Sequence, residues 1–376
     1  MPATYLITGG AGFIGSYLVE ELARHGHRVR VLDSLVEQVH GPRGNSTAVR
    51  RRLEQLGAEL VNGDIRDTAA LHRALDGVDG VVHLAAEVGV GQSMYEIARY
   101  VGGNDLGTAV LLEALIERPI ARLVVASSMS IYGEGAYQTE EGERVRDVRR
   151  RPEDVRAGIW EPATNSGDRL VSMPTDETKA ADLASIYALT KYAQERSALI
   201  IGDAYPIEVV ALRLFNVFGP GQALSNPYTG VLANFGARLM HGERPMVFED
   251  GAQSRDFVHV RDVAKAFFAA LTARGVAGEV FNVGSGRSYR IADVARMLAA
   301  AMGVPHLQPA ILMQARAGDI RHCYADITKA RDLLRFVPEH TLEESVAEMA
   351  AWVAAADAAD HGEDARRQLE SFGLVS

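Results

Sequence analysis

The sequence has a single cysteine, few lysines and no long hydrophobic run. The one cysteine, Cys323, excludes an internal disulfide and any cysteine-rich metal site, and we expect no bound metal. No stretch is long and apolar enough to cross a bilayer, and the first residues lack the basic segment of a signal peptide, so we expect a cytoplasmic protein without a membrane partner. The formal net charge of −10 argues against nucleic acid as the main partner. These absences leave a soluble enzyme or small-molecule binding protein to consider.

The length and composition are those of a two-lobed α/β protein. With 376 residues and 47% apolar side chains, the chain can build more than one core. Apolar runs at 61–65, 80–85 and 122–127 alternate with helical patterns such as 69–75 and 106–117, and this alternation is typical of a parallel sheet with crossover helices. We therefore predict an α/β protein with a Rossmann-type doubly wound parallel sheet and a smaller C-terminal substrate-binding lobe.

A glycine-rich loop follows the first predicted strand, 4–8, and precedes a helical pattern at 16–25. The spacing is G-x-x-G-x-x-G, and the loop includes Gly9, Gly12, Phe13, Ile14 and Gly15. Such a loop lets phosphate oxygens approach backbone N–H groups at a helix N-terminus. The next strand, 28–33, ends in Asp33, eighteen residues after Gly15. A carboxylate there accepts hydrogen bonds from a ribose diol and repels a 2′-phosphate, which favours NAD over NADP.

Polar or small residues stand at the ends of the next predicted strands. These residues are Asp64, Ile65, Ala85, Ala86, Ser127 and Ser128. The ligand of an open α/β sheet lies over such carboxyl ends. Asp64 can reach an adenine or serve as a simple turn residue before Arg66, and the sequence leaves both alternatives open. His83 lies within an apolar strand, where a core histidine is the favoured interpretation.

Tyr187 and Lys191 lie four residues apart in the segment 185–191. On a helix this spacing puts both side chains on one face, so the ammonium can sit beside the phenol and favour its ionised form. A tyrosine with a reference pKa of about 10 then becomes a plausible base near neutral pH. Together with the glycine loop, this pair predicts a dinucleotide-dependent enzyme.

These features resemble the extended short-chain dehydrogenase/reductases of the NAD-dependent nucleotide-sugar epimerase/dehydratase family. The resemblance covers nearly the whole chain, from Gly9 to about Leu333. Beyond the glycine loop and the Tyr187/Lys191 pair, the matching motifs are His83-Leu84-Ala85-Ala86, Asn104 before Gly107-Thr108, 127–133, 213–220, 255–257 and 316–319. The family resemblance implies bound NAD and a nucleotide-diphosphate sugar as substrate.

By that resemblance, Ser128 binds the reacting sugar oxygen, Tyr187 is the acid/base, and Lys191 holds the nicotinamide ribose. The cofactor contacts it implies are Gly9, Gly12, Phe13, Ile14, Gly15, Asp33, Asp64, Ile65, Leu84, Ala85, Ala86, Asn104, Ser127, Tyr187 and Lys191. The substrate contacts are Ser128, Met129, Ser130, Asn216, Arg255, Arg316, Asp319 and Cys323. Arginine also suits a diphosphate on chemical grounds, because its planar fork of donors matches phosphate oxygens. Each arginine taken alone is more often a surface ion-pair partner.

Within the family, 4,6-dehydratases carry an Asp-Glu pair directly after the catalytic hydroxyl. Here Met129 and Ser130 hold those positions, and neither can act as a general acid or base at neutral pH. We therefore predict an NAD-dependent 4-epimerase, an isomerase that works through C4 oxidation, a 4-keto intermediate and return of the hydride. A decarboxylase of nucleotide-linked uronic acids is the closest alternative, ahead of a 4,6-dehydratase. A non-enzymatic NAD-sensing protein is a distant third, because such proteins typically lack the Tyr-x-x-x-Lys pair.

Two departures from the smaller galactose epimerases bear on the substrate. The segment 134–183 is polar, arginine-rich and punctuated by prolines, so we expect a long loop over the active site that acts as a lid, a pocket wall or a passive surface excursion. Cys323 stands where galactose epimerases place a Tyr or a Cys against the sugar, which implies a roomy pocket; an inert buried thiol is the alternative. The inserted loop and the segments 127–135, 33–35 and 38–41 most resemble the branch of dTDP-L-rhamnose 4-epimerases.

We expect an NAD-binding domain at 1–218, rejoined by a strand and helix at 257–272, and a nucleotide-sugar-binding lobe at 219–376. The alanine-rich tail from residue 354 is expected to be helical or frayed. The resemblance also implies a homodimer, paired through the helices at 106–117 and 184–201.

Overall fold

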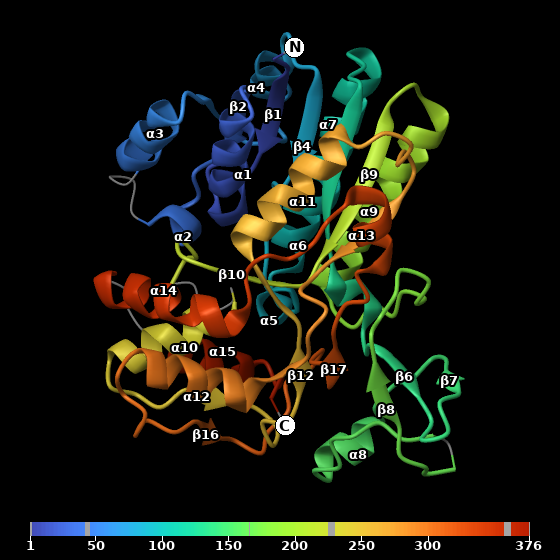
Figure 1. Cartoon of the computed structure of the whole chain (residues 1–376), viewed down its shortest axis with the longest axis vertical. Coiled ribbons are helices and arrows are strands. Elements are labelled where there is room, and N and C mark those ends of the chain that lie inside the picture. Colours follow the sequence, from blue (N-terminus) through green and yellow to red (C-terminus); the bar gives the residue numbers. More distant parts are fainter. Residues whose placement is uncertain (1, 42–45, 165, 225–229, 357–361, 376) are drawn as a thin grey trace.

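Seven parallel strands form the centre of the computed structural model, which describes residues 2–41, 46–164, 166–224, 230–356 and 362–375 (Figure 1). The strands are β1 (Thr4–Thr8), β2 (Arg28–Asp33), β3 (Glu59–Asn62), β4 (Gly80–His83), β5 (Arg122–Ser128), β9 (Glu208–Leu214) and β14 (Val280–Val283). Their order is β14-β9-β5-β4-β1-β2-β3, and every neighbouring pair is parallel. The chain starts at β1 in the middle and winds outward in both directions, which confirms the doubly wound Rossmann-type sheet.

Helices cover both faces of this sheet because side chains alternate along each strand. Ile7 of β1 points to a core shared with α1 (Phe13–Arg24), and Leu6 points to the opposite core. The first face also carries α3 (Ser46–Gln55), α11 (Val260–Thr272) and α13 (Thr328–Leu334); the second carries α4 (Thr68–Leu75), α7 (Gly107–Glu117) and α9 (Ile186–Ala204). With both faces covered, ligands can reach only the strand ends.

Short helical turns lie at the carboxyl ends of the strands. They are α2 (Glu37–His40), α5 (Val90–Ser93), α6 (Ile97–Tyr100), a π-helical turn (Val101–Leu106) that runs into α7, and a 3-10 turn (Met129–Tyr132) after β5. Loops at this edge are where α/β sheets place their functional residues.

A second lobe lies beyond the carboxyl ends of the sheet (Figure 1). Its core contains Phe235, Leu298 and Met349, one from each of the helices α10 (Val231–Met240), α12 (Ile291–Ala301) and α14 (Leu342–Ala355). The small strands are β10 (Asn216–Phe218) paired with β13 (Phe257–His259), β11 (Met246–Val247) paired with β16 (Ala310–Ile311), and β12 (Ser254–Arg255) between β15 (Tyr289–Arg290) and β17 (His322–Cys323). The tail forms a last helix, α15 (Gly362–Ser371). No helix in the described part of the chain is long and apolar enough to cross a membrane.

The expected return of the chain to the main sheet at 257–272 is wrong for its strand. β13 pairs with β10 outside the seven-stranded sheet, and only α11 rejoins the first domain, where it packs on α1. The strand that rejoins the sheet is β14, beside β9. Its four residues include the polar Asn282, whose side chain bonds to Tyr132 in the core, so the apolar pattern was too short and interrupted to predict it. The division into two lobes at residue 218 stays a prediction.

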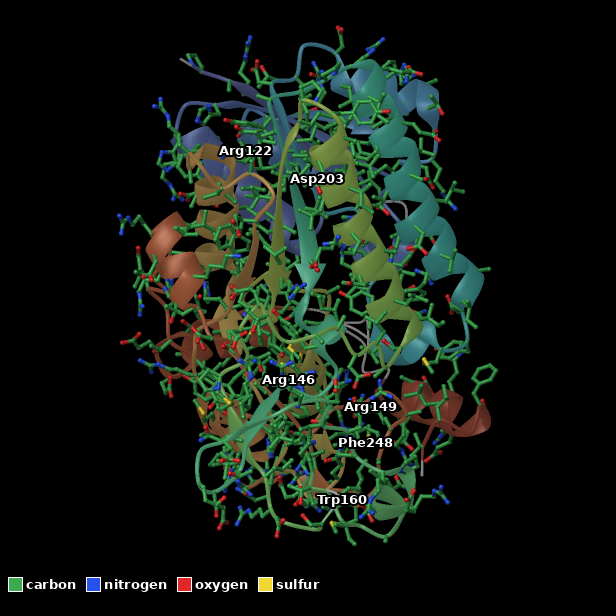
Figure 2. All side chains as sticks on the ribbon, turned by 90° about the vertical axis from the view of Figure 1, so that its right-hand side faces the viewer. Arg122, Arg146, Arg149, Trp160, Asp203 and Phe248 are labelled. Atoms are coloured by element: carbon green, nitrogen blue, oxygen red, sulfur yellow. The ribbon has the colours of Figure 1, made fainter. Side chains whose placement is uncertain are left out.

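The inserted segment 134–183 is not an irregular loop. It folds into a three-stranded antiparallel sheet, β7 (Arg144–Val145), β6 (Ala136–Gln138) and β8 (Val171–Met173), with a short helix, α8 (Pro152–Arg156). Figure 2 shows Trp160 of this insertion at one end of the molecule and Arg122, at the start of β5, near the other. The insertion therefore extends the molecule beyond the carboxyl ends of the sheet.

Buried ion pairs fasten the insertion to the second lobe. The guanidinium of Arg150 donates to Glu134 at 2.9 Å, to Glu249 at 2.5 Å and to the backbone oxygen of Asp319 at 2.8 Å. Arg321, which is almost fully buried, donates to Glu249 at 2.9 Å, and its backbone N–H donates to Glu134. Because buried charges are costly unless paired, each group in this network depends on the others.

We expect Arg150→Met to lower the free energy of unfolding by about 3–5 kcal/mol, since it leaves two buried carboxylates short of a partner. Arg149→Met is the matched control: the side chain of Arg149 is 72% exposed and pairs with Asp182, whereas that of Arg150 is 7% exposed. An exposed pair contributes less than about 1 kcal/mol. Chemical denaturation of both variants measures the difference, and equal losses would contradict the proposed anchoring role.

Candidate active site

A cavity of about 760 Å³ opens over the carboxyl ends of the sheet and extends into the second lobe. It is lined by most of the residues that the sequence predicted. These are Gly9, Gly12, Phe13, Ile14, Gly15, Asp33, Asp64, Ile65, Leu84, Ala85, Ala86, Ser127, Ser128, Met129, Ser130, Tyr187, Lys191, Asn216, Arg255, Arg316 and Asp319. Two predicted residues, Asn104 and Cys323, do not line it.

The glycine loop is shaped for close backbone packing and leaves space above the N-terminus of α1. Gly9 has φ +70°, and a Cβ there would lie 2.8 Å from the backbone nitrogen of Ala85. A Cβ on Gly15 would lie 2.5 Å from the Cα of Gly10. At Gly12 the nearest atom to an added Cβ is the oxygen of Gly9 at 3.3 Å, and Gly12 lines the cavity. No side chain caps α1 at Gly12, so its first N–H groups fit a pyrophosphate.

Asp33 is buried at the end of β2, on the cavity wall. Its carboxylate accepts hydrogen bonds from the backbone N–H groups of Ala11 at 3.0 Å and Leu35 at 2.9 Å, and His40 Nε2 lies 3.5 Å from it. These contacts fix the orientation of the carboxylate beside the glycine loop. His40 also lines the cavity; the sequence analysis missed it, because a lone histidine in a polar segment carries no pattern.

Asp64 has features of both alternatives that the sequence left open. Its carboxylate accepts from the backbone and the guanidinium of Arg66, at 2.8 and 2.6 Å, as a turn residue does. The bond to Arg66 lowers the pKa of Asp64. Asp64 also lines the cavity, as Ile65 does. A contact between Asp64 and the adenine therefore stays a prediction.

Ser128 and Tyr187 meet at the cavity wall from two different elements. Ser128 ends β5, and Tyr187 lies in the first turn of α9, whose N-cap Ser185 accepts a hydrogen bond from the N–H of Ala188. Burial raises the pKa of Tyr187, and its hydrogen bond with Ser128 lowers it in part. The hydroxyl of Ser130 donates to Ser128 at 3.0 Å. The hydroxyls of Ser128, Ser130 and Tyr187 therefore lie together on the cavity wall.

The expected effect of Lys191 on Tyr187 is not present in the protein alone. Lys191 is buried, and its Nζ donates to Gln194 Oε1 at 2.6 Å. Burial lowers the pKa of Lys191 to about 7, and burial rather than the lysine dominates the pKa of Tyr187. The shared helix face predicted the neighbourhood correctly, but it could not predict that desolvation outweighs the charge.

Gln194 orients Lys191 and was missed by the sequence analysis. Its amide Nε2 donates to Thr108 Oγ1 at 2.8 Å and lies 3.1 Å from His83 Nε2, so its oxygen must face the lysine. His83 Nδ1 in turn lies 2.7 Å from Thr8 Oγ1. Burial lowers the pKa of His83 to about 3, which confirms a neutral core histidine. The only sequence signal for Gln194 was a polar residue on the buried face of a helix.

Asn104 is buried behind the residues that line the cavity. Its Oδ1 accepts from the N–H of Glu87 at 2.7 Å, and its Nδ2 donates to Thr190 Oγ1 at 2.9 Å. It thus ties the loop after β4 to α9. The predicted direct contact with the cofactor is not supported, because the fully buried Asn104 does not line the cavity.

Two arginines and the side-chain amide of Asn216 line the cavity on the side of the second lobe. The guanidinium of Arg255 donates to the backbone oxygens of Ile320 at 2.6 Å and Arg321 at 3.0 Å. Arg316 donates to Asp319 at 2.8 Å, and its guanidinium carbon lies 4.5 Å from the centre of the Phe248 ring. Asn216 Oδ1 is buried without a hydrogen-bond partner among the described residues. These groups offer positive charge and an open acceptor to a ligand.

Neither Cys323 nor the insertion contributes to the cavity wall. Cys323 is buried, its Sγ lies 3.8 Å from Thr175 Oγ1, and burial raises its pKa to about 12. It is the inert thiol of the alternative reading, and the inference of a roomy pocket loses its basis. No described residue of the insertion, 134–164 and 166–183, lines the cavity. This part of the insertion therefore supports the second lobe from outside and does not form a lid.

The glycine loop, Asp33 and the Ser128, Tyr187 and Lys191 group define an extended short-chain dehydrogenase/reductase. A sequence model of the NAD dependent epimerase/dehydratase family matches residues 5–152 and 166–284. The chain belongs to this family.

Similar proteins include several sugar-nucleotide enzymes. The chain is 36% identical to a dTDP-L-rhamnose 4-epimerase of Burkholderia thailandensis, over 93% of this chain and 94% of that protein. It is 28% identical to a UDP-N-acetyl-alpha-D-glucosaminuronate decarboxylase of Bacillus cytotoxicus, over 92% and 96% of the two chains. The crystal structure of a UDP-glucuronic acid 4-epimerase from Bacillus cereus, in complex with UDP-glucuronic acid and NAD, has a TM-score of 0.76 at 25% identity and covers 93% of this chain and 98% of its own.

We expect the NAD-free protein to take up protons when it binds NAD at pH 8. With its pKa at about 7, roughly nine in ten Lys191 side chains are neutral at that pH. Ribose hydroxyls favour the charged ammonium donor, so binding raises this pKa and protons are taken up; at pH 6 the amine is already charged and uptake is smaller. Calorimetry in buffers of different ionisation enthalpy measures it.

Lys191→Met is the control for this linkage. It should bind NAD more weakly and show no proton uptake at pH 8. Equal heats for the wild-type protein in all buffers at pH 8 would contradict the role of Lys191.

Proposed function

We propose that the protein is an NAD-dependent nucleotide-sugar 4-epimerase. The observation that carries the proposal is the Ser128 and Tyr187 pair on the cavity wall, beside a pyrophosphate cradle and without acid groups at 129 and 130. Met129 packs into a hydrophobic cluster with Phe215, and Ser130 bonds to Ser128. The positions that would drive water elimination are therefore occupied by an apolar side chain and a hydroxyl.

The residues of this chain supply proton transfer and orientation. Ser128 holds the 4-hydroxyl oxygen of the sugar while Tyr187 accepts its proton, which leaves a ketone once the C4 hydrogen is removed. Bound NAD supplies the hydride acceptor at C4 and then the donor that returns the same hydrogen. The 4-keto sugar turns before that return, and Tyr187 gives the proton back to the oxygen. No net redox change or loss of mass results.

The cofactor contacts follow from the cradle described above. The Gly9 to Gly15 loop and the N-terminus of α1 would hold the pyrophosphate, and Asp33 would accept the adenosine ribose hydroxyls. Lys191 would donate to the nicotinamide ribose, held in place by Gln194. A 2′-phosphate would meet the buried Asp33 carboxylate, so NAD is favoured over NADP.

The substrate we propose is a neutral hexose on a nucleoside diphosphate. Arg255 and Arg316 lie on the cavity wall where a diphosphate would need cationic donors, and Asn216 Oδ1 can accept from a sugar hydroxyl. The dTDP-linked 6-deoxyhexoses are the first to test, because the Burkholderia relative is named for one. A screen of UDP-, dTDP-, GDP- and CDP-hexoses and uronic acids, with products identified by mass and NMR, decides the base and the sugar.

We further propose a cytoplasmic homodimer. Leu106, Leu189 and Ile200 are exposed large apolar residues at or near α7 and α9. Pairing of two copies through these helices would remove them from water. Sedimentation analysis of the purified protein tests the dimer.

A uronic acid decarboxylase is the second candidate, since one relative carries that activity. The 4-keto intermediate is common to both reactions, and decarboxylation then releases carbon dioxide. A 4,6-dehydratase is less favoured because of Met129 and Ser130. A non-enzymatic NAD-binding protein is third, since the catalytic hydroxyl, phenol and amine are all present.

We expect Tyr187→Phe to keep the fold and bound NAD but to lose at least about a thousandfold in kcat, because only the acid/base oxygen is removed. Tyr289→Phe is a matched control, on a tyrosine outside the cavity wall whose hydroxyl donates to Glu343. Steady-state rates with the preferred nucleotide sugar measure the effect. Turnover within tenfold of wild type in the Tyr187→Phe variant would eliminate Tyr187 as the base.

The net reaction should interconvert C4 epimers of equal mass, without added cofactor. Run in deuterated water, the product should keep its original hydrogen at C4, because the hydrogen does not exchange with solvent between removal and return. Mass spectrometry and NMR of the product test this. A product lighter by water would indicate a dehydratase, loss of carbon dioxide a decarboxylase, and deuterium at C4 would exclude the hydride route.

A further inference from the structure

The last helix of the chain, α15, forms part of the cavity wall. The tail residues that line the cavity are Gly362, Ala365, Arg366, Leu369 and Leu374. The first four recur at helical spacing and so share one face of α15. The sequence predicts only a helical or frayed tail here, because nothing in the segment indicates a ligand.

Contacts with both halves of the molecule hold α15 in this place. On the dinucleotide side, Leu369 Cδ2 lies 3.2 Å from where a Cβ on Gly91 of α5 would stand. The rings of Phe372 and Tyr95 stack with centroids 4.7 Å apart. α15 thus packs against the segment that follows β4.

On the substrate side, the tail joins the loop that carries Arg316. The backbone oxygen of Leu374 accepts from the N–H of Ala317 at 2.8 Å, and Arg316 forms a β-bridge with Val375. Gly318 of the same loop faces Val90, whose Cγ1 lies 3.6 Å from the place of a Cβ on that glycine. The tail therefore crosses from one side of the cavity to the other, next to Arg316.

Arg366 lies on this wall, and one of the three nitrogens of its guanidinium has no acceptor among the described residues. Its two terminal nitrogens donate to Glu370 at 2.8 Å and Glu363 at 3.0 Å. Its Nε is buried and has no hydrogen-bond partner, and it is the only side-chain nitrogen in that state within the described part of the chain. A buried N–H without an acceptor carries a desolvation cost that a phosphate oxygen would remove.

Of the other arginines that line the cavity, the two from the second lobe are already engaged. Arg255 donates to backbone oxygens of 254, 320 and 321, and Arg316 donates to both oxygens of Asp319. To the donors of Arg255 and Arg316, Arg366 adds a buried N–H that has no acceptor in the described part of the protein and that a dianionic diphosphate could satisfy. We propose that Arg366 binds a phosphate oxygen of the nucleoside diphosphate, so that α15 is a substrate-binding element of the enzyme. This inference rests on the proposed nucleotide-sugar substrate and names a further residue for it.

Full-length variants test the role of Arg366. In Arg366→Gln, we expect the Kd of UDP, dTDP, GDP or CDP, whichever binds the wild-type protein most tightly, to rise roughly tenfold or more, as befits one charge-assisted hydrogen bond. Arg367→Gln is the matched control, because that side chain is 70% exposed and does not line the cavity. Calorimetric titration measures all three proteins, with their NAD content as the control for folding.

Glu370→Gln separates binding from support of the helix. It removes one ion-pair partner of Arg366 and keeps the guanidinium, so the Kd should stay within about twofold of wild type. An increase equal to that of Arg366→Gln would mean that the arginine acts through the helix, which overturns the proposal. An unchanged Kd in Arg366→Gln would overturn it as well.

Hydrogen exchange of the wild-type protein provides a test without substitution. The same nucleoside diphosphate should slow amide exchange in peptides from α15, and no change there would overturn the proposal. Binding to the wild-type protein with no effect at α15 would leave the proposed epimerase function standing. Failure of all four nucleoside diphosphates to bind the wild-type protein would overturn both.

Discussion

The packing of the glycine loop against the end of β4 is the constraint on which the site depends. Gly9 approaches Ala85 so closely that no side chain fits between them, and Gly15 approaches Gly10 in the same way. This contact brings β1, α1 and the end of β4 together at the point where the strand order reverses. A crevice must open there, because the chain leaves β1 on one side and enters β4 from the other. Asp33, Tyr187 and Ser128 line this crevice from β2, α9 and β5.

Desolvation governs the chemistry of the crevice. The same burial raises the pKa of Tyr187 and lowers that of Lys191 to about 7. A buried phenol and a buried amine both prefer their neutral forms, so the protein alone holds a weak base next to a weakly charged lysine. A dinucleotide bound beside Lys191 would change that balance by giving the lysine an acceptor. Cofactor binding and activation of the tyrosine would then be one event, with Gln194 as the support of the lysine.

Charged groups join the insertion and the tail to the second lobe. Arg150 and Arg321 join the insertion to the loops that carry Glu249 and Asp319, and the tail joins the same region through Ala317. The loop with Arg316 is therefore held from two sides, by the insertion and by α15. Such support matters because a substrate that must turn between two half-reactions needs a wall that stays in place. The insertion serves the site from a distance, although it touches none of the cavity.

The sequence by itself determined the local chemistry: the glycine spacing, Asp33, the Tyr187 and Lys191 pair and the alternating strands all act through neighbours close in the chain. Those signals were enough to predict the parallel sheet apart from β14, and to predict that the glycine loop, Ser128, Tyr187 and Lys191 lie together at its carboxyl ends. Only the tertiary structure decided that β14 completes the sheet, that Asn104 and Cys323 lie outside the cavity, and that Arg366 lies on its wall. Burial and long-range contacts decide these features, because residues more than a hundred positions apart share one crevice only after the two lobes have packed.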